Sequence, residues 1–233
     1  MDGYTRYALY YAPPPGPLAD LGAAWLGWDA EAARRVELPE GRSWPPLPLS
    51  RRTLTDKPRK YGFHGTLKPP FTLNEEREVA GLHGAIAALA PRLHRVRLDG
   101  MRLSSIGPFL ALVPEGETEA LDALAATFVE ALDGFRAAPD EAELTRRRAI
   151  GLTESQEALL ARWGYPYVME EFRFHITLTG PIPDPAERDA VAMALAPLFE
   201  PLLEQPFRID EVCLFGEGQD GMFRNLHRYA LTG

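Results

Sequence analysis

Two short stretches of the chain carry residues that could do chemistry. "YGFHGTLKPP" (61–70) and "FRFHITLTGP" (172–181) share Phe-His-x-Thr-Leu, and each has a proline at the same offset. An imidazole titrates close to neutrality, so one histidine can act as a base and a second as an acid. A single His-x-Thr is common by chance. Two copies, each followed by a loop and a helix-like segment, indicate an internal duplication.

Strand geometry predicts where these side chains point. Both stretches read as strands, in which successive side chains alternate between the two faces. One face is then apolar and predicted to join the core: Phe63, Gly65, Leu67, Phe174, Ile176 and Leu178. The other face is polar: His64, Thr66, Lys68, Arg173, His175, Thr177 and Thr179. A duplicated fold can bring the two polar faces together across a cleft.

That set of groups fits phosphodiester chemistry. A neutral histidine removes a proton from an attacking water or hydroxyl, and a protonated one donates to the departing oxygen. Thr66, Thr177 and Arg173 can hold the non-bridging oxygens, where charge builds up. We therefore predict His64, Thr66, His175 and Thr177 as catalytic residues, with either histidine as the base. The chemistry requires no metal or cofactor, and the sequence contains no HExxH or clustered Asp/His motif.

Five further residues are candidates for phosphate or substrate binding. Arg173 is two residues before His175 and so points to the same face of the strand, although a surface ion pair is the alternative. Lys68 follows the polar face, but two prolines after it could bend it away. By strict alternation Tyr61 points to the apolar face, unless the following glycine relaxes the strand. Arg6 and Tyr10 share one face of the first strand, where they could line the cleft or cover the sheet.

Composition limits the class of protein. The chain has 233 residues, 45% of them apolar, and 25% charged, as in ordinary globular proteins. Its formal charge of −8 disfavours binding to extended nucleic acid, although short basic clusters at 57–62 and 145–151 could touch an anion. With no signal peptide, no membrane-spanning run and a single cysteine, Cys213, we expect a cytoplasmic protein that does not enter membranes.

Helices and strands are predicted to alternate along the chain. The expected strands are 5–13, 61–71, 94–100, 109–114, 170–180, 207–216 and 222–231, and the expected helices are 18–36, 74–89, 118–133, 139–164 and 185–203. Residues 39–58, rich in proline, are expected to form an irregular connection. Asn74 and Asp184 are predicted helix caps, and "TESQ" (153–156) is a capping box.

These elements predict an α+β fold in a single bilobal domain, 1–233. The first lobe would cover roughly 1–135 and the second roughly 136–233, each an antiparallel sheet backed by helices. The His-x-Thr strands would face each other across a central groove. Residues 139–164 read as a helical insertion, and the wider segment 136–170 has no counterpart in the first half. We expect it to flank the cleft and narrow it towards a small sugar phosphate.

At these motifs the chain resembles the two-histidine (2H) phosphoesterases, whose hallmark is a pair of His-x-Thr/Ser motifs on two pseudo-symmetric lobes. The longer stretches "YGFHGTLKPPF", "FLALVP", "RWGYPYV" and "EFRFHITLTG" are similar to the branch encoded among phosphonate-utilisation (carbon–phosphorus lyase) genes. Members of the family cleave or form cyclic phosphodiesters and 2′,5′ linkages in RNA or nucleotides. The branch implies a cyclic ribose phosphate as substrate.

Three functions follow as alternatives. The first is a metal-independent cyclic phosphodiesterase acting on a small cyclic ribose phosphate or nucleotide. The second is an RNA-processing enzyme that opens 2′,3′-cyclic phosphates or seals 2′,5′ ends, which the acidic charge disfavours. The third is a non-catalytic nucleotide-binding module, which has no need for two histidines.

Overall fold

The computed structural model describes residues 3–38, 40 and 43–233. The strands are β1 (Arg6–Tyr11), β2 (Gly65–Phe71), β3 (Val96–Leu98), β4 (Gly100–Ile106), β5 (Phe109–Glu115), β6 (Ile176–Thr177), β7 (Phe207–Ile209), β8 (Glu211–Glu217) and β9 (Phe223–Ala230). The α-helices are α1 (Pro17–Leu26), α2 (Arg51–Arg59), α3 (Val79–Leu89), α4 (Glu119–Ala131), α5 (Glu141–Arg148), α6 (Glu154–Trp163) and α7 (Pro185–Phe199). The predicted α+β class is confirmed.

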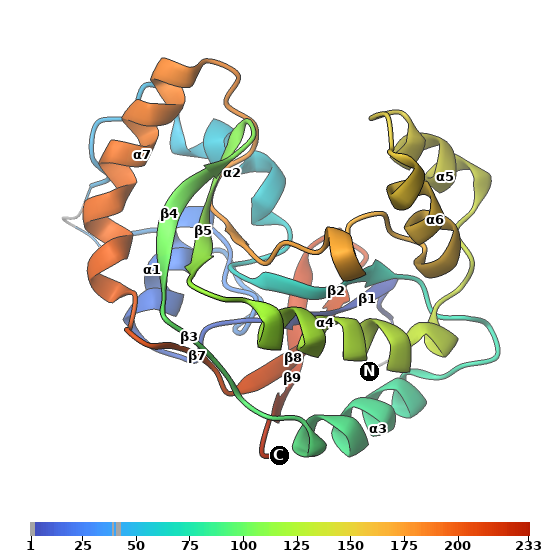
Figure 1. Cartoon of the computed structure of the whole chain (residues 1–233). Coiled ribbons are helices and arrows are strands. Elements are labelled where there is room, and N and C mark those ends of the chain that lie inside the picture. Colours follow the sequence, from blue (N-terminus) through green and yellow to red (C-terminus); the bar gives the residue numbers. More distant parts are fainter. Residues whose placement is uncertain (1–2, 39, 41–42) are drawn as a thin grey trace.

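Most strands belong to one antiparallel sheet in the order β4-β5-β6-β2-β1-β8-β9, and β3 pairs with β7 in a second, small sheet. The division into sheets differs from the expected one sheet per lobe, because β2 and β6 join the two parts. Helix α4 packs against β2, and α7 packs against β4 and β5. Figure 1 shows the β4–β5 hairpin and α7 on one side of the central strands, with α5 and α6 on the other.

Strand pairing crosses the expected lobe boundary near residue 135. The hairpin of β4 and β5, from the first half of the sequence, pairs with β6 from the second half. Conversely, β8 and β9 come from the second half and pair on to β1. Each part of the large sheet is therefore built from both halves of the chain.

The two His-x-Thr motifs meet at the centre of this sheet. Gly65 of β2 pairs with Ile176 of β6, so the motifs lie on neighbouring antiparallel strands. The ring of Phe174 lies directly over Gly65, where a Cβ atom would come within 2.4 Å of it. Glycine is required at this position because the second motif occupies the space of its side chain.

The predicted alternation of the motif strands is confirmed for their apolar residues. Leu67, Phe174, Ile176 and Leu178 are buried in the larger apolar core. A smaller core on β1, β8 and β9 includes Tyr10, Phe215, Phe223 and the buried Cys213. No helix in the described part of the chain has the length and apolarity needed to cross a bilayer.

Several local signals read from the sequence are confirmed. Thr153 and Gln156 form the capping box of α6, and Gly164 ends that helix in the left-handed conformation. The side chain of Asp184 accepts a hydrogen bond from Ala186 N at the start of α7. These signals depend only on neighbouring residues, which is why the sequence predicts them.

The connection expected at 39–58 was partly wrong. Residues 51–59 form α2, capped by the Ser50 side chain, which accepts a hydrogen bond from Thr53 N. The prolines that suggested an irregular segment lie almost entirely before this helix. Residues 39, 41 and 42 of the predicted connection lie outside the described residues.

Three other elements are shorter than predicted. The helix expected at 18–36 ends at Leu26, because Gly27 adopts a left-handed φ of 77° and donates to Ala23 O. Helix α3 begins at Val79 rather than at Asn74, whose side chain accepts from Glu76 N in a turn before the helix. The strand expected at 170–180 is reduced to the two residues of β6.

Candidate active site

A cavity of about 1140 Å³ opens over β1, β2 and β6, and helix α5 forms part of its wall. The four predicted catalytic residues, His64, Thr66, His175 and Thr177, all line it. Of the predicted binding residues, Arg6, Tyr10, Tyr61 and Arg173 also line this cavity. The structure thus brings together residues that are up to 171 positions apart in the chain.

Both histidines are held by the same backbone contact. The Nδ1 atom of His64 lies 3.0 Å from Gly62 O, and Nδ1 of His175 lies 2.7 Å from Arg173 O. A carbonyl oxygen only accepts hydrogen bonds, so Nδ1 carries the proton in each ring. In the neutral state each Nε2 is therefore unprotonated and able to accept a proton.

Gly62 makes the first of these contacts possible. Its φ of 76° lies in the left-handed region that glycine adopts without strain. A Cβ atom at this position would also lie 2.8 Å from the Ala30 side chain. The glycine before the first motif therefore helps to fix the tautomer of His64.

The threonines lie next to the imidazoles. Thr66 Oγ1 is 3.2 Å from His64 Nε2, and the neutral ring accepts this hydrogen bond from the hydroxyl. Because Gly65 pairs with Ile176, an antiparallel register continued by one residue in each direction sets His64 opposite Thr177, and Thr66 opposite His175. Each histidine thus faces the threonine of the other motif.

Aromatic rings hold the two histidines in different surroundings. Tyr10 stacks on His64 with ring centroids 3.8 Å apart and planes 30° apart. Tyr61 lies 5.9 Å from the same imidazole, centroid to centroid. His175 has Phe109 at 5.6 Å. The stacked tyrosine covers His64 more closely than any ring covers His175.

Burial lowers the pKa of both histidines. For His64 the pKa falls to about 4, chiefly through burial, with a smaller contribution from the charge of His175 and an opposing one from the bond to Gly62 O. Burial also lowers the pKa of His175, and its bond to Arg173 O opposes this. Both imidazoles are therefore neutral at pH 7 in the free protein, and an anion bound between them would favour protonation of one.

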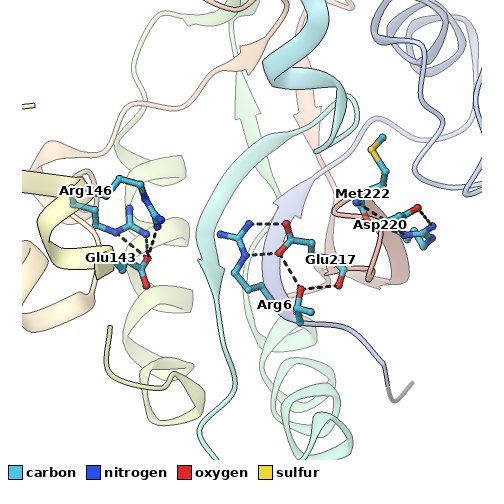
Figure 2. Close-up of polar contacts among 9 residues, drawn as sticks. Arg6, Glu143, Arg146, Glu217, Asp220 and Met222 are labelled. Carbon is cyan, nitrogen blue, oxygen red and sulfur yellow. Dashed lines mark hydrogen bonds and ion pairs between the residues drawn. The ribbon is translucent and has the colours of Figure 1, made fainter. Parts of the chain in front are cut away.

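Two of the predicted arginines contact the cavity in different ways. The Arg173 guanidinium is exposed and donates to Phe172 O at 2.6 Å and to Glu170 O at 3.1 Å. Arg6 forms a bidentate ion pair with Glu217 on β8, with distances of 2.5 and 2.8 Å (Figure 2). Both remain within reach of the cavity as hydrogen-bond donors.

Lys68 is not brought into this cavity. Its Nζ donates to Val129 O of α4 at 3.1 Å, and the residue is only 2% exposed. Tyr10 pairs with Thr66 but Leu9 pairs with Lys68, so β2 holds one extra residue at this point. This bulge turns Lys68 to the face of Leu9, away from Thr66.

Further residues of the cavity wall lie in segments with weaker sequence signals. Lys60, Arg146 and Arg147 line the cavity and belong to the two basic clusters noted above. Tyr165, from "RWGYPYV", also lines it. The expectation that segment 136–170 flanks the cleft is therefore confirmed.

One arginine of that segment lies elsewhere. Arg136 is not on this wall: it forms an ion pair with Asp133 and donates to the backbone carbonyl of Arg162 at the end of α6. The described residues contain no group of three or more His, Cys, Asp or Glu placed to hold a metal ion.

Comparison with known protein families shows to which family the chain belongs. Residues 66–224 match DUF1045, the family described as "Protein of unknown function (DUF1045)". The chain belongs to this family. The match begins at the first threonine of the His-x-Thr pair and includes the whole second motif.

Two curated relatives of this DUF1045 chain carry the name "Ribose 1,5-bisphosphate phosphokinase PhnN". The one from Janthinobacterium sp. (strain Marseille) is 40% identical over 76% of the chain and 39% of the relative. The one from Laribacter hongkongensis (strain HLHK9) is 36% identical over 93% of the chain and 49% of the relative. The chain thus spans less than half the length of these relatives.

Among solved structures, E. coli LigT complexed with 3′-AMP is similar, with 15% identity, full coverage of both chains and a TM-score of 0.43. The two His-x-Thr motifs, on which the resemblance to two-histidine phosphoesterases rests, are paired at the centre of the sheet.

Proposed function

We propose that this chain is a metal-independent cyclic phosphodiesterase in which His64 and His175 act as the general base and the general acid. The observation that carries the proposal is the pairing of β2 with β6, with both His-x-Thr motifs lining one cavity. Each imidazole is fixed through Nδ1, which leaves Nε2 for proton transfer. A protein that only binds nucleotides needs neither feature.

The proposed reaction is hydrolysis of one P–O bond of the ring. Water attacks phosphorus while Nε2 of the neutral histidine takes its proton. The ring P–O bond breaks as the protonated histidine donates to the departing sugar oxygen. The product is a phosphomonoester and a free hydroxyl, and the pair of histidines ends with the same number of protons.

We assign the base to His64 and the acid to His175. Of two coupled imidazoles, the one with the more strongly lowered pKa is the one that stays neutral when the pair holds a single proton. The lowering is large for His64, which lies under Tyr10. His175 would then hold the proton once the substrate's negative charge is bound.

Thr66, Thr177 and Arg173 are proposed to hold the non-bridging oxygens. The hydroxyl of each threonine lies on the same face of the sheet as the histidines, and the Arg173 guanidinium adds a positive charge at the edge of the cavity. Hydrogen bonds to these oxygens strengthen as negative charge develops in the transition state.

The proposed substrate is a small cyclic ribose phosphate. The relatives are named for ribose 1,5-bisphosphate, and opening a ribose 1,2-cyclic phosphate at its C2 oxygen gives a ribose 1-phosphate. Their name also refers to a kinase. We do not propose a kinase for this chain, because its sequence has no GxxxxGK[ST] phosphate-binding loop and spans less than half of those proteins.

The proposal is tested with a panel of cyclic ribose phosphates, 2′,3′-cyclic nucleotides and oligonucleotides ending in a 2′,3′-cyclic phosphate, each with and without EDTA. We expect turnover of a small cyclic ribose phosphate that is unchanged by EDTA. Loss of activity on chelation, restored by a divalent ion, would contradict the mechanism. A strong preference for the oligonucleotides would mean that the substrate is the end of an RNA and not a small cyclic ribose phosphate.

A further inference from the structure

An irregularity in β2 decides which side of the sheet the first His-x-Thr motif faces. Leu9 of β1 pairs with Lys68 of β2. The next residue of β1, Tyr10, pairs with Thr66, so β2 holds one extra residue between the two pairs. In an uninterrupted strand His64, Thr66 and Lys68 would share one face, because successive side chains alternate. That face would be the one of Leu9, which is buried in the larger apolar core.

The extra residue reverses this arrangement. Leu67 and Lys68 are consecutive and yet both buried, as expected for the two bulge residues that lie on the same side of a sheet. Before the bulge, Thr66 and His64 lie on the opposite side and line the cavity. Tyr10 belongs to the smaller core on that side and stacks on His64. The first motif therefore reaches the cavity, and meets Tyr10, because β2 has this bulge.

Lys68 ties the bulge to helix α4, which packs beside β2 (Figure 1). Its Nζ donates to Val129 O in the last turn of α4, at 3.1 Å, and lies 5.3 Å from the ring centroid of Phe71. The last carbonyl groups of a helix have no partner within it and form the negative end of its dipole, so an ammonium group is favourable there. Pro69 and Pro70, which follow, have no N–H to donate to β1.

A lysine is an unusual choice for this buried position. Burial lowers the pKa of Lys68 to about 8, which the nearby Asp133 opposes and Arg136 reinforces, so the side chain keeps its proton at pH 7. An apolar side chain would fill the space without the cost of burying a charge. The void beside Lys68 measures about 10 Å³, which is room for no more than one water. What the lysine adds is therefore its directed bond to α4.

We propose that Lys68 is a positioning residue of the active site. By tying the bulge of β2 to α4, it places His64 and Thr66 on the side of the sheet that faces the cavity, and it holds the ring of His64 under Tyr10. Lys68 touches no reacting atom and acts through the strand. The inference deepens the proposed function and rests on it for the effect on turnover, whereas the effect on His64 can be measured without a substrate.

Lys68→Met tests this role, because methionine fills a similar space without the charge or the donor. With the bulge released, the stack of Tyr10 on His64 should loosen and admit water to the imidazole. The pKa of His64, followed by NMR through its ring protons, should then rise by about 1 towards the ordinary ~6.5. Lys57→Met is the matched control: Lys57 is exposed on α2 and does not line the cavity, so the pKa of His64 should not change.

A double-mutant cycle separates positioning from the loss of a charge. If Lys68 acts through the stack, Lys68→Met should raise the pKa of His64 in the wild type but not in Tyr10→Leu, where the stack is already absent. An equal rise in both backgrounds, or an unchanged pKa in folded Lys68→Met, would overturn the proposal. Lys68→Gln, which keeps a donor, is measured in the same way should Lys68→Met not fold. If neither variant folds, Lys68 serves stability alone and the proposal is wrong.

Turnover separates this inference from the proposed function. On a cyclic ribose phosphate, Lys68→Met should lower kcat roughly 10- to 100-fold with little change in KM, as for a misplaced base. If the wild type hydrolyses no cyclic phosphate but the pKa of His64 rises as expected, the positioning role stands and the proposed function fails. If the wild type is active and folded Lys68→Met keeps both its kcat and the pKa of His64, the proposed function stands and Lys68 has no positioning role.

Discussion

His64 and His175 belong to nearly identical motifs but lie in different surroundings. His64 immediately precedes the seven-residue strand β2 and is stacked beneath Tyr10. His175 precedes a strand of two residues and has Phe109 beside it at a greater distance. The local contact of Nδ1 with the carbonyl two residues earlier is the same in both.

The comparison separates what a duplicated motif preserves from what it does not. The motif preserves the tautomer, because the contact that fixes it is made within three residues. It does not preserve the pKa, which depends on how deeply each ring is buried by elements far away in the sequence. Two histidines from nearly identical motifs can therefore take different roles, one as the base and the other as the acid.

The largest expected effect tests this division through the leaving group. His64→Ala and His175→Ala should each lower kcat/KM on a cyclic ribose phosphate by roughly 10²–10⁴-fold. On bis(p-nitrophenyl) phosphate the leaving group departs without a proton. The loss in His175→Ala should then become much smaller, whereas the loss in His64→Ala should persist.

A histidine outside the cavity provides the control for these variants. His94 is exposed and does not line the cavity, so His94→Ala should keep the wild-type rate on both substrates. If the better leaving group rescues His64→Ala instead of His175→Ala, the two roles are reversed.

The next largest effect concerns the pH dependence of kcat/KM and of kcat. Because burial lowers both pKa values, the free enzyme holds a single proton on the pair only at acidic pH. The profile of kcat/KM against pH should be bell-shaped with its maximum below pH ~6.5, the ordinary pKa of histidine. The profile of kcat should have its maximum at a higher pH, since the bound anion raises the pKa of the acid. A kcat/KM that still rises above neutrality would contradict the lowered pKa values.

Part of this site could be predicted from the sequence because it depends on alternation within a strand. The inward Phe174 and the outward His64 and Thr177 follow from a period of two. The position of Lys68 could not be predicted, because it depends on a bulge in the pairing of β1 with β2. The register between two distant strands leaves no mark on the local sequence of either one.

The basic side chains of the cavity wall could also be predicted only in part. The basic cluster at 145–151 is visible in the sequence, but Arg146 and Arg147 line the cavity while Arg148 pairs with Glu157. Which of the three consecutive arginines line the cavity depends on how α5 packs. The short β6 could not be predicted either, since the residues before it alternate as a longer strand would.

The threonines should give the smallest effects. Thr66→Val and Thr177→Val should each lower kcat/KM roughly 10- to 100-fold, as for one hydrogen bond to a charged group. Thr66 also donates to His64 Nε2, so its loss removes a bond to the neutral ring and should raise the pKa of His64. The acidic limb of the profile should therefore move to higher pH in Thr66→Val only.

Thr127→Val, on α4, is the control for both threonine variants, because among the described residues its hydroxyl donates only to Ala123 O of the same helix. An equal shift of the acidic limb in Thr66→Val and Thr177→Val would show that the two motifs do not differ in this contact.

The most direct test of the histidine pair is a double-mutant cycle with His64→Ala, His175→Ala and the combined variant on a cyclic ribose phosphate. If the two imidazoles serve one proton-transfer step, the combined loss in kcat should be far smaller than the product of the single losses. All three proteins should fold like the wild type, by circular dichroism and thermal unfolding. Near-wild-type turnover in either folded single variant would contradict the two-histidine mechanism.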